Sequence, residues 1–149
     1  MRILFVCLGN ICRSPTAEGV MRHLLAQRGL AGEVEVASAG TGSWHVGSPP
    51  DARSAEAARR RGIVLAGAAQ QVRPADFAAY DLLVAMDRSN LADLLALAPD
   101  EAARAKVRLL LVDADVPDPY YGGERGFDDV LDLVTEACER LVDEVAARR

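Results

Sequence analysis

A loop of unusual chemistry lies close to the start of the chain, where residues 7–15 read Cys-Leu-Gly-Asn-Ile-Cys-Arg-Ser-Pro. It follows an apolar run and precedes a helical pattern, so its backbone N–H groups can point inward and the helix adds its positive N-terminal end. Together they suit an anion of the size of phosphate. Arg13 adds a planar guanidinium that can hold two phosphate oxygens. Gly9 and Asn10 tolerate the left-handed backbone that a tight loop requires.

Cys7 is expected at the base of this loop. Inward N–H groups, a helix N-terminus and a guanidinium favour the thiolate form of a cysteine, and a thiolate below a bound phosphate can attack phosphorus in line. We also expect Ser14 as the N-cap of the helix and Pro15 at its first position. Cys7 and Cys12 could instead be two zinc ligands, but one further cysteine and two distant histidines make a poor site.

A second loop, residues 118–123, reads Asp-Pro-Tyr-Tyr-Gly-Gly. Asp-Pro and Gly-Gly are also common in ordinary turns. A cysteine that displaces a phenolate or alkoxide, however, needs an acid to protonate the leaving oxygen. The carboxyl group of Asp118, on a stiff Asp-Pro turn, is a candidate for that acid.

The elements that must position these loops alternate between strand and helix patterns. We predict strands over 3–6, 33–39, 81–86 and 107–112, and helices over 15–29, 51–61, 89–98 and 127–147. This alternation predicts an α/β fold, with an open, mostly parallel sheet between two layers of helices. Ligands bind outside the carboxyl ends of the strands in such sheets, so the loops after the first and fourth strands should meet there.

Length and composition limit the alternatives. A chain of 149 residues is the size of one domain, and we predict a single domain over 1–149. The net charge of -5 argues against binding nucleic acid or an anionic membrane. No apolar run could span a membrane and no signal peptide is evident, and three cysteines suit a reducing compartment, so we expect a cytoplasmic protein.

These residues together resemble a known family, the low-molecular-weight protein tyrosine phosphatases. The family signature Cys-x5-Arg-Ser-Pro is matched by Cys7, Arg13, Ser14 and Pro15. The resemblance extends to Ser-Ala-Gly-Thr-Gly-Ser-Trp at 38–44, Gly47 with Pro49-Pro50-Asp51, Met86-Asp87 with Ser89-Asn90, and Asp-Pro-Tyr-Tyr-Gly at 118–122. It covers essentially the whole chain. It implies a four-stranded parallel sheet flanked by helices, with the phosphate-binding loop after the first strand.

The resemblance also implies roles for single residues in the hydrolysis of phosphotyrosine through a phosphocysteine intermediate. Cys7 is then the nucleophile, Arg13 the phosphate clamp and Asp118 the general acid and base. The remaining loop positions bind phosphate: Leu8, Gly9, Asn10, Ile11, Cys12 and Ser14. Asn10 and Ser14 also hold the loop and the cysteine sulfur, Ser38 bonds Asn10, and Asp87 supports Arg13.

The walls of the substrate crevice are implied at Trp44, Tyr120 and Tyr121. Cys12 has the spacing to form a reversible disulfide with Cys7 that would protect the nucleophile from further oxidation. Neither a metal nor a cofactor is expected. The implied partners are tyrosine-phosphorylated proteins, with a bacterial-type tyrosine kinase among them, and the chain is expected as a monomer or weak dimer. Cys138 is expected to be structural, and His23 and His45 are expected at the surface.

Three other functions are compatible with parts of this pattern. An arsenate reductase needs further cysteines just after the third strand, and residues 85–98 contain none. A protein arginine phosphatase typically has threonine at the position of Ile11, so Ile11 favours phosphotyrosine. A phosphoprotein-binding module would need the loop without the nucleophile or the acid, whereas both are present.

Overall fold

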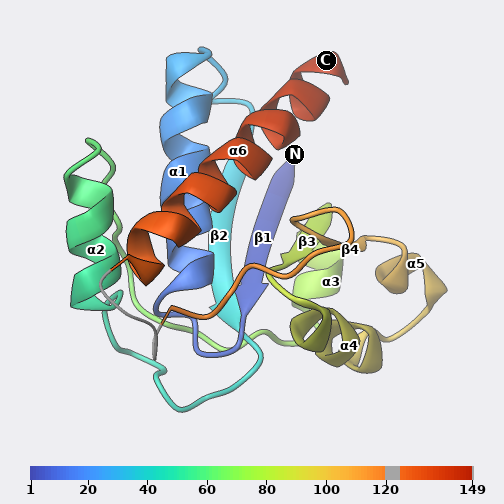
Figure 1. Cartoon of the computed structure of the whole chain (residues 1–149). Helices are drawn as coiled ribbons and strands as arrows, with labels where there is room; N and C mark the ends of the chain where they lie inside the picture. The colour runs from blue at the N-terminus through green and yellow to red at the C-terminus, as the bar shows by residue number, and fades with distance from the viewer. Residues whose placement is uncertain (120–124, 149) are drawn as a thin grey trace.

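The computed structural model describes residues 1–119 and 125–148. Its centre is a parallel sheet in the order β2-β1-β3-β4 (Figure 1). The strands are β1 (Arg2–Cys7), β2 (Glu35–Gly40), β3 (Leu82–Ala85) and β4 (Val107–Leu109). The apolar run Ile3, Leu4, Phe5 and Val6 is fully buried, because β1 lies between two neighbours and is covered on both faces.

The helices form a layer on each face of the sheet, as Figure 1 shows. One layer contains α1 (Arg13–Gln27), α2 (Ala52–Arg59) and α6 (Gly126–Ala147), and the other α3 (Asp76–Ala79), α4 (Arg88–Leu97) and α5 (Glu101–Arg104). Alternate residues of β1 serve the two layers: Ile3 and Phe5 belong to one hydrophobic cluster, Leu4 and Val6 to the other. The predicted three-layer α/β fold with a four-stranded parallel sheet is confirmed.

The boundaries differ from the sequence prediction in a few places. The fourth strand ends at Leu109 rather than at residue 112, and α3 and α5 were not predicted. Each of these helices has four residues, too few for a helical hydrophobic period to appear in the sequence. Within the described ranges, no helix has the length and apolar character needed to cross a membrane.

The start of α1 also differs from the prediction. Its N-cap is Cys12, without a side-chain cap, so Ser14 and Pro15 lie inside the first turn rather than at the N-cap and the first position. Proline is tolerated there because the first N–H groups of a helix have no intrahelical acceptor. The hydroxyl of Ser14 is thereby free to serve the loop instead of the helix end.

Candidate active site

The loop between β1 and α1 turns its carbonyl groups outward. The carbonyl oxygens of Cys7, Leu8 and Ile11 accept N–H groups at 2.9, 2.9 and 2.7 Å, all from the single connection between β2 and α2. In a trans peptide the N–H group points away from the carbonyl, so the amides that follow these carbonyls face the concave side. Successive inward N–H groups above a helix N-terminus are suited to an anion.

Two positions make this tight turn possible. Asn10 has a φ of 57°, in the left-handed region, whereas Gly9 does not have a positive φ. Gly40, at the end of β2, lies directly beneath the loop, and a Cβ there would stand 2.7 Å from the Leu8 oxygen. The left-handed residue is therefore Asn10 alone, and the glycine that permits the close approach comes from the neighbouring strand.

Cys7 ends β1 and is 3% exposed, with its sulfur at the base of the loop. The backbone N–H of Asn10 donates to Cys7 Sγ at 3.2 Å, and Ser14 Oγ lies 3.0 Å from the same sulfur. A thiolate can only accept hydrogen bonds, so in that state both groups donate to it. The sulfur is thus placed to accept two hydrogen bonds, one from the loop backbone and one from the first turn of α1.

The side chain of Asn10 fixes the direction of these bonds. Its Oδ1 accepts the backbone N–H of Gln70 at 2.9 Å, which assigns the two amide protons to the other end of the group. Those protons go to Ser14 Oγ at 2.8 Å and Ser38 Oγ at 2.9 Å. Since Ser14 Oγ already accepts from Asn10, its own proton can point at Cys7 Sγ, and the other acceptor nearby, the Ala39 oxygen, is farther away at 3.4 Å.

The network continues beyond the residues that the sequence indicated. Ser38 donates to Glu18 Oε1 at 2.7 Å, and Glu18 in turn forms an ion pair with Arg22. Ser14, Glu18 and Arg22 follow one another at intervals of four residues, which places them on one face of α1. The spacing of these three polar residues could have predicted that Glu18 belongs to the network. No such spacing indicates Gln70.

Arg13 is held at the edge of the site by residues from the other half of the chain. Its side chain is 5% exposed, and Nη1 donates to Asp87 Oδ2 at 2.6 Å and to the Val116 oxygen at 3.0 Å. Asp118 Oδ2 lies 3.8 Å from Nη2 of the same guanidinium. The structure thus brings Arg13, Asp87 and Asp118 together, as the crevice rule for parallel sheets requires.

A cavity of about 400 Å³ opens above the loop. It is lined by Cys7, Leu8, Gly9, Ile11, Cys12, Arg13, Trp44, His45 and Asp118. Trp44 is 73% exposed at the mouth, so its indole is available to a ligand. His45, expected only as a surface residue, also lines the pocket; its ring packs over Gly9, where a Cβ would meet it at 3.0 Å. Tyr120 and Tyr121 lie outside the described residues.

Cys12 differs from Cys7 in its surroundings, although both are buried free thiols. Burial raises the pKa of Cys12 from its ordinary value of 9.0 to about 12, against the opposing effect of a hydrogen bond with Ser54. Cys12 therefore remains a protonated thiol at neutral pH. Cys7 and Cys12 are both free thiols in this structure, and the disulfide between them stays a prediction.

A parallel α/β sheet, an anion-binding loop and a buried cysteine define the class of α/β enzymes that bind phosphate next to a cysteine. The family model described as low molecular weight phosphotyrosine protein phosphatase matches residues 2–149. The chain belongs to this family, and it is an enzyme of the protein-tyrosine-phosphatase class.

Curated relatives and solved structures agree with this assignment. A low molecular weight protein-tyrosine-phosphatase of Streptomyces coelicolor is 46% identical over 149 residues, covering 95% of this chain and 91% of that one. The phosphatase YfkJ of Bacillus subtilis is 44% identical over 146 residues, covering 94% and 92%. The crystal structure of a protein tyrosine phosphatase from Entamoeba histolytica, with Hepes in the active site, has a TM-score of 0.95 at 38% identity and covers 99% and 97%.

Two further solved structures are similar to this chain. Wzb of Vibrio vulnificus in complex with benzylphosphonate has a TM-score of 0.85 at 33% identity, covering 96% of this chain and 97% of that one. A Drosophila arginine phosphatase has a TM-score of 0.90 at 34% identity, covering 97% and 98%.

Proposed function

We propose that this chain hydrolyses phosphotyrosine in proteins, with Cys7 as nucleophile, Arg13 as phosphate clamp and Asp118 as general acid and base. The observation that carries the proposal is the position of the Cys7 sulfur. It lies at the base of the cavity and is within hydrogen-bonding distance of two donors, the Asn10 N–H and the Ser14 hydroxyl.

In the first step Cys7 Sγ attacks phosphorus and the bond from phosphorus to the tyrosyl oxygen breaks. Asp118 gives its proton to that oxygen, so that tyrosine leaves as a neutral phenol. In the second step Asp118 removes a proton from water while the water oxygen attacks phosphorus. The S–P bond breaks, and inorganic phosphate and the Cys7 thiolate are released.

The loop supplies the stabilisation that both steps require. Three phosphate oxygens carry the charge around the phosphorus. The inward N–H groups of Leu8, Gly9 and Cys12 and the guanidinium of Arg13 are donors for them. Asp87 and the Val116 oxygen hold the Arg13 guanidinium through Nη1, which orients it as a donor for phosphate.

The shape of the pocket favours an aromatic phosphate ester. Cys7 and Trp44 line the same cavity, so a phosphate held at the sulfur leaves an aromatic surface for the tyrosyl ring to contact. A phosphoserine side chain has no ring to make that contact, so the pocket favours phosphotyrosine. Benzylphosphonate, the ligand bound to the similar Wzb, likewise combines an aromatic ring with a tetrahedral anion. We propose tyrosine-phosphorylated proteins as the partners, a bacterial-type tyrosine kinase among them.

Ile11 separates this proposal from phosphoarginine hydrolysis, which the similarity to the Drosophila arginine phosphatase raises. Ile11 lines the cavity and offers an apolar surface to a ring. Ile11→Thr is expected to increase the ratio of phosphoarginine to phosphotyrosine hydrolysis. An unchanged ratio would exclude Ile11 as the selective residue.

Cys12 is proposed to protect the nucleophile from oxidation. A peroxide converts the Cys7 thiolate to a sulfenic acid, and the Cys12 thiol displaces water from it to form the disulfide. Peroxide-treated enzyme should then recover with dithiothreitol, and Cys12→Ser should recover far less.

The deciding experiment is the release of phosphate from a phosphotyrosine peptide in the presence of EDTA, with Cys7→Ser as the matched variant. We expect turnover that persists in EDTA and is absent from Cys7→Ser. Rapid quenching of the wild type should also trap one phosphate per chain on cysteine. No turnover by freshly reduced wild type would exclude the proposed activity.

A further inference from the structure

Asp118 is on a segment without regular secondary structure, which runs from the end of β4 across the carboxyl edge of the sheet. The Asp118 side chain is 45% exposed. A general acid must nevertheless hold its proton within hydrogen-bonding reach of one oxygen atom. Residues 113–118 must therefore be fixed against the rest of the site.

Val116 provides the first attachment. Its N–H donates to the Met86 oxygen at 2.8 Å, and its carbonyl accepts from Arg13 Nη1 at 3.0 Å. The side chain is 1% exposed and belongs to the hydrophobic cluster shared with α1 and α6. Val116 thus fixes the segment two residues before Asp118, but it leaves residues 113–115 to be held by other contacts.

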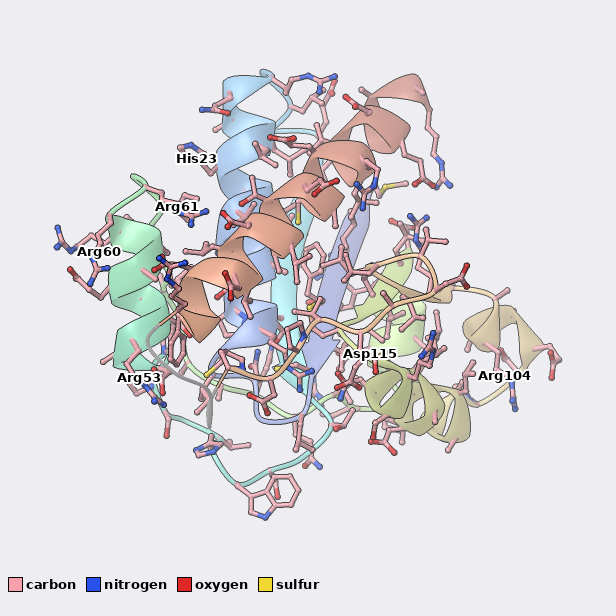
Figure 2. All side chains as sticks on the ribbon, viewed as in Figure 1. His23, Arg53, Arg60, Arg61, Arg104 and Asp115 are labelled. Atoms are coloured by element: carbon pink, nitrogen blue, oxygen red, sulfur yellow. The ribbon has the colours of Figure 1, made fainter. Side chains whose placement is uncertain are left out.

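Asp115 provides a second attachment, to the N-terminus of α4, and Figure 2 shows it beside this helix. Its Oδ1 accepts the backbone N–H of Arg88 at 3.0 Å. Arg88 is the first residue of α4, where an N–H group has no intrahelical acceptor. The guanidinium of Arg88 also donates to the Asp113 oxygen at 2.8 Å. Arg88 therefore holds the segment through its backbone and its side chain.

The N-terminus of α4 consequently orients both charged groups of the site. Asp87, its N-cap, accepts the N–H of Asn90 at 2.7 Å through Oδ1 and holds Arg13 through Oδ2. Asp115 occupies the neighbouring N–H and holds the segment that carries Asp118. Arg13 and the segment that carries Asp118 are thus both held by the N-terminus of α4. This helix packs against β3 and β4.

We propose that Asp115 is a positioning residue, which sets Asp118 against Arg13 by capping the first N–H of α4. The inference rests on the proposed function, because it takes Asp118 as the general acid. It predicts that loss of the Asp115 contact weakens protonation of the leaving group and leaves phosphate binding and nucleophilic attack intact.

The test uses four variants of the whole chain. Asp115→Ala removes the acceptor, and Asp115→Asn keeps an oxygen that can accept the same N–H. Arg88→Pro removes the N–H itself. Proline is well tolerated at the first position of a helix. The residue before a proline must be extended, and Asp87 already is, with φ -146° and ψ 173°. Arg88→Ala is its control, because it loses the same side chain but keeps the N–H.

The readout is kcat/KM for a series of aryl phosphates whose phenols differ in acidity. A poor leaving group depends on the acid, whereas a good one leaves without a proton. We expect Asp115→Ala to lose roughly tenfold on phenyl phosphate and less than about twofold on an activated nitrophenyl ester, a fraction of the effect of a whole general acid. Asp115→Asn should keep most of the rate, and Arg88→Pro should fall below Arg88→Ala by a similar factor.

Asp118→Asn is measured in parallel, to separate the two proposals. The role of Asp115 alone would be overturned by one pair of results. In that pair, the loss of kcat/KM in Asp118→Asn depends steeply on the acidity of the leaving phenol, whereas kcat/KM of Asp115→Ala and Arg88→Pro does not depend on it. An equal loss of Asp115→Ala on all esters would overturn it too, since that indicates general damage. A flat series for Asp118→Asn would overturn the acid role of Asp118 and with it the inference.

Discussion

Asp87 serves the site with both oxygens of one carboxylate. One oxygen caps α4 through the N–H of Asn90, and the other holds Arg13 at 2.6 Å. Most caps at a helix N-terminus are exchangeable among Asp, Asn, Ser and Thr, because each can accept from the backbone. The contact to a buried guanidinium, by contrast, needs the carboxylate. The two duties can therefore be separated by substitution.

Asp87→Asn and Asp87→Ala are expected to weaken competitive inhibition by inorganic phosphate alike, by about tenfold, because both lose the charge-assisted bond to Arg13. Only Asp87→Ala also loses the cap of α4. It should be less stable than Asp87→Asn by about 1 kcal/mol in urea unfolding. Phosphate inhibition of Asp87→Asn at the wild-type level would contradict the role given to this contact.

At the scale of elements, the phosphate-binding loop depends on the end of β2 as much as on β1 and α1. The register pairs Cys7 with Gly40, and the loop folds back over that glycine. The loop carbonyls are in turn bonded by the chain that leaves β2, at the N–H groups of Thr41 and Gly42. The end of β2 therefore shapes the anion site, although β2 does not carry the nucleophile.

Gly40→Ala is expected to lower kcat/KM by at least about tenfold, since its Cβ would stand 2.7 Å from the Leu8 oxygen and 3.2 Å from the Asn10 nitrogen. The loop has to shift, and overpacking of this kind reduces stability by about 1–3 kcal/mol. Gly32→Ala is the matched control, because no atom lies within 4 Å of the Cβ it would add. Activity of Gly40→Ala equal to that of Gly32→Ala would show that the loop does not need this close approach.

At the scale of the whole molecule, the sheet is buried between two hydrophobic clusters. The larger one joins α1, α2 and α6 to β1, and Cys138 of α6 is fully buried in it, with Sγ 3.9 Å from the Ala17 oxygen. Burial raises the pKa of the Cys138 thiol far above its ordinary value of 9.0, with a smaller contribution from Glu139. This thiol is structural, as the sequence indicated, and its protonation is linked to folding.

The linkage predicts a loss of stability at high pH. Above pH 9 the unfolded chain releases the Cys138 proton and the folded chain keeps it, so the free energy of unfolding should fall by about 1.4 kcal/mol per pH unit. Below pH 9 both states are protonated and no dependence arises from this group. The raised pKa of Cys12 acts in the same direction.

Urea unfolding at several values between pH 8 and pH 11 measures this slope. Cys138→Ala should be less stable than the wild type at pH 8, because it leaves a cavity, but its slope should be shallower by about 1.4 kcal/mol per unit. Parallel curves for the two proteins would mean that the thiol does not titrate on unfolding.

The sequence by itself was sufficient for the fold class and for the centre of the site. The uniformly apolar run of β1 predicted a strand buried on both faces, and the alternation of elements predicted a parallel sheet whose loops meet at one edge. Those two facts predict that the loops carrying Cys7, Arg13 and Asp118 lie at the same edge of the sheet. Local composition is enough here because burial on two faces and the change between strand and helix periods leave direct marks on neighbouring residues.

Only the tertiary structure decided how these groups are held. Asn10 is oriented by the N–H of Gln70, and Asp115 caps the first N–H of α4. The serine expected as the N-cap of α1 instead faces the sulfur of Cys7. Each of these contacts depends on which N–H or carbonyl group remains without a partner after the elements have packed. That is a property of three-dimensional hydrogen-bond satisfaction, and residue spacing along the chain does not record it.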